Sequence, residues 1–253
     1  MVVAATGFFD GVHLGHVRVI EELCSVAHSE GKKSAVITFW PHPRIVLNQD
    51  ADKLRLLTSL DEKKELFHSM GVDEVHVIDF TKELSLLSAE EFIKRYLIEM
   101  FDVSTLVIGY DHRIGHGAGG KGSALKKVAE NLGIKAVRVR AVEDEYDTIS
   151  STHIRSFIES GVMERANEML GYNYFLTGKV SGVDQAEGSV QLAVGEPLKL
   201  LPERGDYDAV VTIAGVRHPA VGHIFRGKVS FSADSLSEIE IGDAVKAEFL
   251  SKI

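Results

Sequence analysis

Cysteine and long hydrophobic runs are what this chain most lacks. Cys24 is the single cysteine in 253 residues, which excludes an internal disulfide and fits a reducing cytoplasm. No apolar run approaches the roughly 20 residues that a membrane-spanning helix needs, so we expect no membrane association. The formal net charge of −9 argues against general nucleic-acid binding but leaves room for a local basic pocket. With neither a Cys pair nor a His-Glu-x-x-His segment, we expect no zinc site.

What the chain does contain is a turn rich in glycine and histidine at Gly7–His16. It follows an apolar run, Val2–Ala5, and precedes residues 17–23, whose apolar positions recur at helical spacing. Strand, turn and helix in this order aim backbone N–H groups and a helix N-terminus at an anion. His13 and His16 lie three residues apart at the helix start and project on nearly one side, where a phosphate would sit.

Small residues in the same turn leave space for a ligand. Gly11 and Gly15 remove side chains where phosphates would approach the backbone closely. The turn therefore indicates a nucleotide-handling enzyme. The alternative interpretation is a capped helix start that carries two surface histidines.

The turn also resembles a known signature, the His-x-Gly-His of the nucleotidylyltransferase superfamily. Its longer form from Phe9 to His16 resembles one branch, the prokaryotic bifunctional riboflavin kinase/FMN adenylyltransferases, or FAD synthetases. Further segments resemble this branch in order and spacing: Thr38–Pro43, Ile108–Gly117, Ile149–Arg155 and Gly171–Val180. The resemblance covers roughly the first 180 residues.

The resemblance implies roles for particular residues. It implies that His13, His16 and Asp10 are catalytic, with Asp10 close to the ATP phosphates and to a Mg²⁺ ion that those phosphates hold. It implies that further residues bind ATP or its phosphates: Gly7, Phe9, Gly11, Gly15, Ser151, Thr152 and Arg155. It implies a flavin- or nucleotide-lining role for Pro41, His42, Pro43, Asp111 and Arg113. From the residues alone, Asp10 is equally well a turn residue that bonds its own backbone.

The second phosphate segment also has a chemical rationale. Residues 150–152 carry three hydroxyls before an amphipathic helix start, where an N-cap and backbone N–H groups form an anion cradle. Arg155 adds a planar, bidentate donor suited to the β- and γ-phosphates of ATP. The alternative from the residues alone is an ordinary helix cap at Ser151 and a surface arginine.

The chain departs from the branch at several positions. Phe8 stands where an Asn is usual, and His112 and Ile114 stand where aromatic residues are common. These changes concern contacts to the flavin more than contacts to the phosphates. After Val180 there is no Gly-x-Pro-Thr-Ala-Asn segment of the kind that the riboflavin kinase domain carries, which argues against kinase activity.

Alternating apolar and amphipathic runs predict an α/β fold over the first 140 residues: a Rossmann-like parallel sheet with helices on both faces. The ligand crevice should lie at the carboxyl ends of the strands. The predicted strands are Val2–Thr6, Ser34–Phe39, Glu74–Asp79, Leu106–Gly109 and Ala136–Val139. The predicted helices are Val17–Ser29, Asp61–Ser69, Ala89–Phe101 and Ala124–Leu132, and Ser59–Glu62 and Ser88–Glu91 have capping-box spacing.

From Gly178 the pattern changes to short alternating segments: Gly188–Val194, Tyr207–Ile213, Val221–Val229 and Ala244–Phe249. They predict a small antiparallel β-barrel or sandwich. We therefore predict two domains, a nucleotidylyltransferase domain at 1–175 and a reduced, riboflavin-kinase-like barrel at 176–253.

FMN adenylyltransferase activity is the leading functional hypothesis, with Mg²⁺ required and with ATP and FMN as substrates. One alternative is adenylyl or cytidylyl transfer to another phosphorylated acceptor. A second is a bifunctional enzyme that also phosphorylates riboflavin. A third is a flavin- or nucleotide-binding regulatory protein without turnover.

Overall fold

The computed structural model describes the chain except residues 50, 110–111, 116–121, 140–148, 185–187 and 234–238. Contacts group the chain into two units, which are described one at a time. The first comprises Met1–Leu54 and Leu60–Thr148, and the second comprises Arg55–Ser59 and Ile149–Ile253. In the described part of the chain, no helix has the length and apolar character to cross a membrane.

A five-stranded parallel sheet forms the centre of the first unit. Its strands are β1 (Val2–Thr6), β2 (Lys33–Trp40), β3 (Glu74–Asp79), β4 (Val103–Ile108) and β5 (Lys135–Arg138), in the order β3-β2-β1-β4-β5. Strand β1 pairs in parallel with both β2 and β4. The direction in which the chain builds the sheet reverses between β1 and β4, and open α/β sheets bind ligands at such a switch point.

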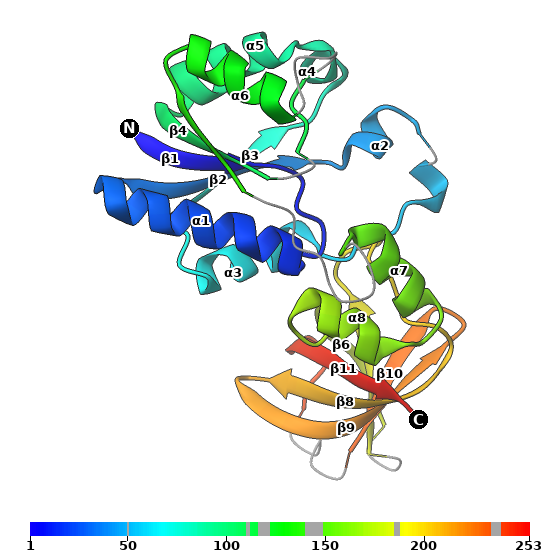
Figure 1. Cartoon of the computed structure of the whole chain (residues 1–253). Helices are drawn as coiled ribbons and strands as arrows, with labels where there is room; N and C mark the ends of the chain where they lie inside the picture. Colours follow the sequence, from blue (N-terminus) through cyan, green and yellow to red (C-terminus); the bar gives the residue numbers. More distant parts are fainter. Residues whose placement is uncertain (50, 110–111, 116–121, 140–148, 185–187, 234–238) are drawn as a thin grey trace. The chain divides into compact units, whose positions relative to one another are not determined.

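Helices cover both faces of this sheet, as predicted (Figure 1). One face carries α1 (Leu14–Glu30) and α3 (Leu60–Ser69), which pack through a cluster that includes Leu23 and Phe67. The other face carries α5 (Ala89–Phe92), the π-helix η2 (Ile93–Met100) and α6 (Gly122–Asn131). Three short elements complete the unit: α2 (Pro43–Val46), the 3₁₀ turn η1 (Ala51–Lys53) and α4 (Lys82–Leu86).

The local signals in the sequence explain where several helices begin and end. Ser88 and Glu91 form the expected capping box at the start of α5, and Gly31 ends α1 with a left-handed φ of 61°. The helix predicted at Ala89–Phe101 is one turn of α-helix followed by the π-helix η2. The predicted extent is therefore close, but its hydrogen-bonding pattern is not that of a continuous α-helix.

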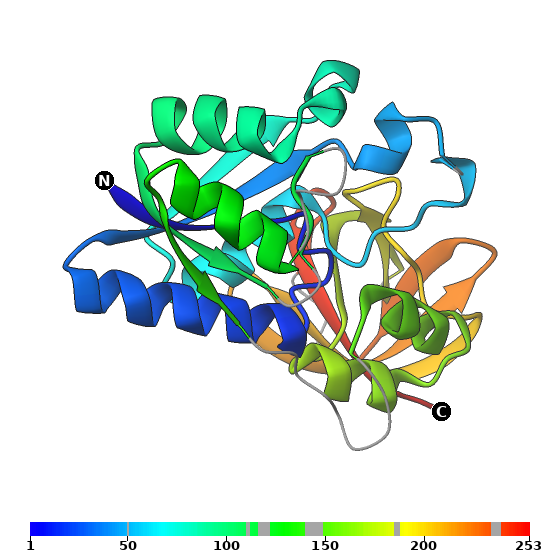
Figure 2. The same cartoon turned by 45° about the horizontal axis from the view of Figure 1, so that its top comes forward.

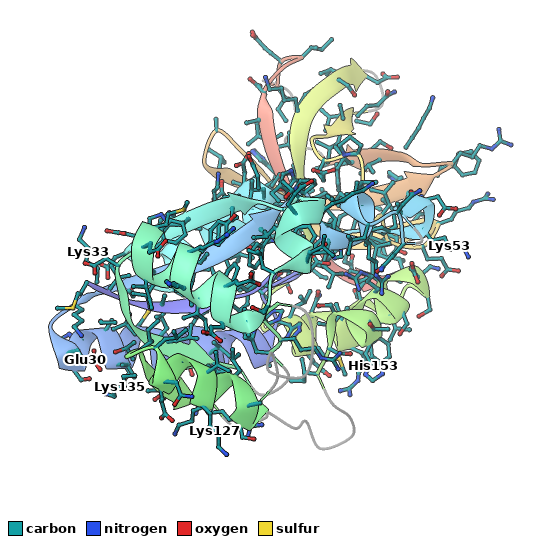
Figure 3. The ribbon with its side chains drawn as sticks, turned by 90° about the horizontal axis from the view of Figure 1, so that it is seen from above. Glu30, Lys33, Lys53, Lys127, Lys135 and His153 are labelled. Atoms are coloured by element: carbon teal, nitrogen blue, oxygen red, sulfur yellow. The ribbon has the colours of Figure 1, made fainter. Side chains whose placement is uncertain are left out.

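A partly buried carboxylate anchors the C-terminal end of α1 to the sheet. Glu30 lies beside Lys135 (Figure 3), with their charged groups 2.8 Å apart. The Nζ of Lys32 is 2.9 Å from the same carboxylate. The Thr105 hydroxyl donates a further bond of 2.9 Å to the same carboxylate. Bonds from Lys135 and then Lys32 lower the pKa of Glu30 to about 2. These contacts fix the helix whose opposite end carries the histidine turn.

The second unit is a closed six-stranded antiparallel barrel with two helices. The strand order is β10-β7-β6-β11-β8-β9. The strands are β6 (Phe175–Asp184), β7 (Ser189–Val194), β8 (Gly205–Ile213), β9 (Val216–Phe225), β10 (Lys228–Ser232) and β11 (Ala244–Lys252). Helices α7 (Ser151–Glu159) and α8 (Met163–Leu170) belong to this unit, and α8 lies against β11 (Figures 1 and 2). The barrel confirms the predicted fold class, and the boundary at residue 175 stays a prediction.

Two features of the second unit differ from the sequence pattern. The single strand predicted at Val221–Val229 is wrong: the segment is a hairpin that turns at Arg226 and Gly227, with φ of 49° and 74°. Both central residues have positive φ, which suits the right-handed twist of the paired strands. In addition, the distant segment Arg55–Ser59 joins the unit, with Leu56 bridged in parallel to Lys199.

Candidate active site

The histidine turn lies at the switch point of the parallel sheet. It connects the end of β1 to the start of α1, and Figure 2 shows the dark-blue segment that leads from one to the other. The segment that follows β4 leaves the sheet at the neighbouring strand end. Residues from these two segments, from the segment after β2 and from α3 form the candidate site in the first unit.

The backbone of the turn is strained. Phe9 and Val12 have φ of 52° and 38°, and Gly11 has φ of 81°. A positive φ is unfavourable for most side chains and most of all for a β-branched one such as Val12. Residues in such conformations persist only where their surroundings hold them, and they concentrate at functional sites. The turn needs a glycine at position 11, but glycine alone does not account for its shape.

His13 and His16 stand together at the start of α1, as the spacing predicts. Their rings stack with centroids 3.7 Å apart, and the ring of Phe9 meets His16 edge-on at 5.2 Å. His13 is the N-cap residue of α1 and is 6% exposed. Among the residues that the structure describes, the buried Nδ1 of His16 has no hydrogen-bond partner. A buried ring nitrogen that has no hydrogen-bond partner and lies beside a helix N-terminus is suited to donate a hydrogen bond to a ligand oxygen.

Burial, together with several positive neighbours, keeps His16 in its neutral form. Burial lowers the pKa of His16 well below its ordinary value, and His13, Lys63 and His112 lower it further. An anionic ligand beside the ring would act in the opposite direction and raise that pKa. The site therefore favours a negatively charged ligand.

His112 joins the site, although the sequence identified it only as a departure from the family pattern. Its Nε2 lies 2.9 Å from the hydroxyl oxygen of Thr6, the last residue of β1. Its position after β4 was the available signal, because the ends of β1 and β4 meet at the switch point. Ile114, the other departure in this segment, is 5% exposed and packs in the core beside α5 and α6.

A buried lysine is the group that sequence reasoning missed. Lys63, on α3, is 0% exposed, and its Nζ donates a 2.6 Å hydrogen bond to the carbonyl oxygen of Phe8. The same nitrogen lies 3.7 Å from the centroid of the Phe8 ring. Burial lowers the pKa of Lys63 to about 8, and the carboxylate of Asp10 opposes that shift. Asp10, in the histidine turn, is 5% exposed, so a buried negative group in the turn interacts with a buried positive group on α3.

Phe8 links this turn to the segment after β2. Its ring lies parallel to that of Trp40 at 6.4 Å and meets the ring of His42 edge-on at 4.2 Å. His42 caps α2, where its Nδ1 accepts a 3.1 Å bond from the backbone N–H of Arg44. The flanking Pro41 and Pro43 are half-buried. The structure thus brings the predicted lining residue His42 to the edge of the histidine turn.

The remaining lining residues are only partly described. Arg113 is exposed, and Asp111 lies outside the described residues, as does most of the glycine-rich segment that ends at Lys121. Gly115 is described and needs to be glycine, because a Cβ there would lie 2.5 Å from the backbone nitrogen of Ala89.

The second phosphate segment belongs to the second unit. The cap of α7 is Ser150, whose hydroxyl accepts a 3.3 Å bond from the N–H of His153. Ser151 is therefore the first helical residue rather than the cap, and Thr152 follows it in the first turn. Arg155 donates through Nε to the carbonyl oxygen of Arg55 at 2.8 Å, which fixes the orientation of its guanidinium.

A second group of polar side chains lies on the barrel. His223 is 2.8 Å from Asp206 and 3.0 Å from the hydroxyl of Ser232. Asp206 and His223 are 61% and 38% exposed, so water surrounds the series, and we assign it to cross-strand stabilisation. The described residues contain no group of three or more His, Cys, Asp or Glu that is placed to hold a metal ion.

The family model and the curated relatives agree on one family. Residues 1–153 match the family described as FAD synthetase. The chain is 35% identical over 244 residues to a bifunctional riboflavin kinase/FMN adenylyltransferase of Listeria monocytogenes, covering 94% of this chain and 76% of that protein. It is 31% identical over 178 residues to an FAD synthetase of the same organism, covering 70% and 72%. It matches the Bacillus subtilis bifunctional protein at 37% identity over 180 residues, but only 56% of that protein's length.

A solved structure with the same fold is found among the structural matches. The crystal structure titled macrolide-efflux protein, from Streptococcus pneumoniae, superposes with a TM-score of 0.88 and covers 100% of this chain and 85% of that one. At 24% identity, this likeness concerns the fold alone.

Proposed function

The chain belongs to the FAD synthetase family, and from that premise we propose that it transfers the adenylyl group of ATP to FMN. A phosphate oxygen of FMN attacks the α-phosphorus, the bond from that phosphorus to the bridging oxygen breaks, and pyrophosphate leaves. The products are FAD and pyrophosphate. Negative charge accumulates on the phosphoryl oxygens, so the protein mainly has to position the reactants and stabilise that charge.

The stacked histidines at the N-terminus of α1 carry this proposal. His13 and His16 supply imidazole donors, and the start of α1 supplies backbone N–H groups, to the phosphates of ATP. Because burial and positive neighbours keep His16 neutral in the free protein, its charged form is favoured only where phosphate charge is present. Stabilisation of this kind speeds the reaction because the charge on the phosphoryl oxygens near the histidines is greater in the transition state than in bound ATP.

The other predicted residues have supporting roles in the proposal. Arg155, oriented by the Arg55 carbonyl, would bind the β- and γ-phosphates with Ser151 and Thr152. His42, beside Phe8, would line the flavin or adenine ring, with Pro41 and Pro43 keeping its segment stiff. Asp111 and Arg113 keep the lining role that the family resemblance implies.

Mg²⁺ fits this site as part of Mg-ATP. Magnesium in phosphoryl-transfer sites is commonly held by one or two carboxylates together with substrate phosphates. Asp10 is the carboxylate of the histidine turn, and it would hold the ion with the ATP phosphates. When bound, the ion would neutralise part of the phosphate charge.

Riboflavin phosphorylation is the second candidate function. The match to the Listeria bifunctional enzyme extends through the barrel, and the barrel contains a pocket of about 400 Å³. Polar residues of this pocket include Gln191, Glu196 and Lys228. The absence of the Gly-x-Pro-Thr-Ala-Asn segment from the sequence argues against this activity.

One experiment separates these functions. The protein is incubated with Mg-ATP and either FMN or riboflavin, and the flavins are resolved by chromatography. FAD from FMN without conversion of riboflavin supports the adenylyltransferase alone, whereas FAD from riboflavin supports both activities. No product from either flavin, in protein that binds ATP, would exclude the proposed reaction and favour another acceptor or a regulatory role.

A further inference from the structure

The buried ammonium of Lys63 has no part in the reaction as proposed so far. Most buried polar groups stabilise a fold, but a fully buried charge is among the groups that proteins avoid unless it is paired. In the described structure the Nζ of Lys63 donates one hydrogen bond, to a neutral carbonyl, and has one aromatic ring beside it. The carboxylate of Asp10 interacts with it electrostatically and offsets part of the cost of burial. Burying this charge at 0% exposure is costly, which indicates a role for Lys63 in the turn that it contacts.

The contacts of Lys63 lie at the point where the histidine turn begins to be strained. The carbonyl that it binds belongs to Phe8, and the next residue, Phe9, has a φ of 52°. The Thr38 hydroxyl also donates to this carbonyl, at 3.4 Å. The stronger, 2.6 Å bond comes from α3, an element outside the turn, so the turn is held from the side as well as along the chain. Its shape decides where His13 and His16 present their rings.

We propose that Lys63 is a positioning residue for adenylyl transfer, which holds the Phe8 carbonyl and thereby keeps the histidine turn in its phosphate-binding shape. The proposal rests on the adenylyltransferase function proposed above. Its charge has a second consequence, because Lys63 is one of the positive groups that keep His16 neutral until an anion arrives. Lys63 acts through Phe8 and His16 and is not assigned a contact with substrate.

The chain contains a closely matched control. Lys199 is also buried, at 4% exposure, and its Nζ donates a 2.6 Å bond to the carbonyl of Leu57. It lies 4.8 Å from the ring of Tyr174. The chemistry is the same as at Lys63, but the carbonyl belongs to a different segment. Lys199→Met therefore reports what loss of a buried ammonium does in general.

The chain also contains a reporter that does not depend on turnover. Trp40 is the single tryptophan, and its ring lies parallel to that of Phe8. A shift of Phe8 changes the surroundings of Trp40 and hence its fluorescence. The emission spectrum therefore reports the position of the turn in protein without substrate.

The test compares wild type, Lys63→Met, Lys63→Arg and Lys199→Met in FAD formation from FMN and Mg-ATP. We expect Lys63→Met to lower kcat by about 10²-fold, since a small misplacement of reacting groups has effects of this size, with the KM for FMN little changed. Lys63→Arg should recover part of the loss, because it keeps a charged donor. Lys63→Met should also shift the Trp40 emission, while Lys199→Met should leave both kcat and emission near wild type. Because Lys199 bonds the segment whose Arg55 carbonyl orients Arg155, any effect of Lys199→Met should fall on the KM for ATP.

Each outcome has a distinct meaning. If Lys63→Met keeps wild-type kcat and Trp40 emission, Lys63 does not position the turn and the proposal is wrong. Equal losses of kcat in Lys63→Met and Lys199→Met would also overturn it, because the effect would then be general destabilisation. If wild type itself forms no FAD, the proposed function fails instead, and the Trp40 emission of Lys63→Met still decides whether Lys63 holds the turn.

Discussion

The stability of the first unit should depend on pH through Lys63. The pKa of Lys63 is lowered from 10.5 to about 8 in the folded protein, because burial disfavours the ammonium. Below pH 8 the side chain is charged in both states, and the folded state carries the full penalty of the buried charge. Between pH 8 and 10.5 the folded protein releases the proton while the unfolded chain keeps it. Stability therefore rises with pH in this window.

The size of the effect follows from the two pKa values. A shift from 10.5 to about 8 corresponds to a penalty of about 3 kcal/mol at neutral pH. At pH 10 about 1 kcal/mol of that penalty is left, since the unfolded chain has then begun to lose its proton as well. Raising the pH from 7 to 10 should therefore stabilise wild type by about 2 kcal/mol relative to Lys63→Met, in which position 63 does not titrate.

Urea unfolding of both proteins at pH 7, 8, 9 and 10 measures this difference. Other groups also make stability depend on pH near the top of this range, such as Tyr207, whose pKa burial raises from 10 in the unfolded chain to about 12. They are present in both proteins and cancel when the free energies of unfolding are subtracted. A difference between wild type and Lys63→Met that stays constant from pH 7 to 10 would refute the assignment of a buried, charged Lys63.

Three further predictions concern the two phosphate segments and the anchor of α1. His16→Gln should lower kcat/KM for FAD formation by roughly 10²-fold or more, because stabilisation of phosphoryl charge is lost. The control is His28→Gln, at an exposed position at the other end of α1, which should have near wild-type rates. Arg155→Lys should raise the KM for ATP more than it lowers kcat, because a lysine cannot bond the Arg55 carbonyl and a phosphate with one planar group; an unchanged KM would contradict the assignment. Glu30 should contribute stability above pH 4.5 that is lost as the pH falls toward 2, so acid unfolding of Glu30→Gln should show a smaller dependence on pH in this range than wild type.

Periodicity and spacing predicted the parallel sheet and the pair of histidines because both depend on local order in the chain. The residues of β1 and β3 coincide with the predicted ranges, and His13, the N-cap of α1, lies beside His16 because only three residues separate them at the helix start. The cap of α7 could not be fixed in the same way. Ser150 and Ser151 are both good caps, and only the fold decides which one lies outside the helix.

Lys63 was missed because a lysine in a polar helix resembles a solvated residue. Helix α3 has acidic residues in its first turn and carries several charges. The available signal was Phe67, four residues further on, which places Lys63 on the same, inward face. The pairing of Leu56 with Lys199 had no signal of this kind, because it joins residues that are far apart in the chain through backbone groups.

The departures from the family pattern bear on whether the chain is an enzyme or a binding protein that has lost turnover. Phe8 gives its carbonyl and ring to Lys63, and His112 bonds Thr6 and adds to the positive field at His16. A site that held only an uncharged flavin ring would gain nothing from positive groups that suppress one another's charge, since this suppression lowers stability at neutral pH. The same arrangement is useful where negative charge grows during a reaction, because a preorganised positive field then stabilises the transition state more than the ground state. The placement of these two residues therefore favours a site that acts on phosphate groups, as an adenylyltransferase does, over a regulatory protein that binds only an uncharged flavin ring.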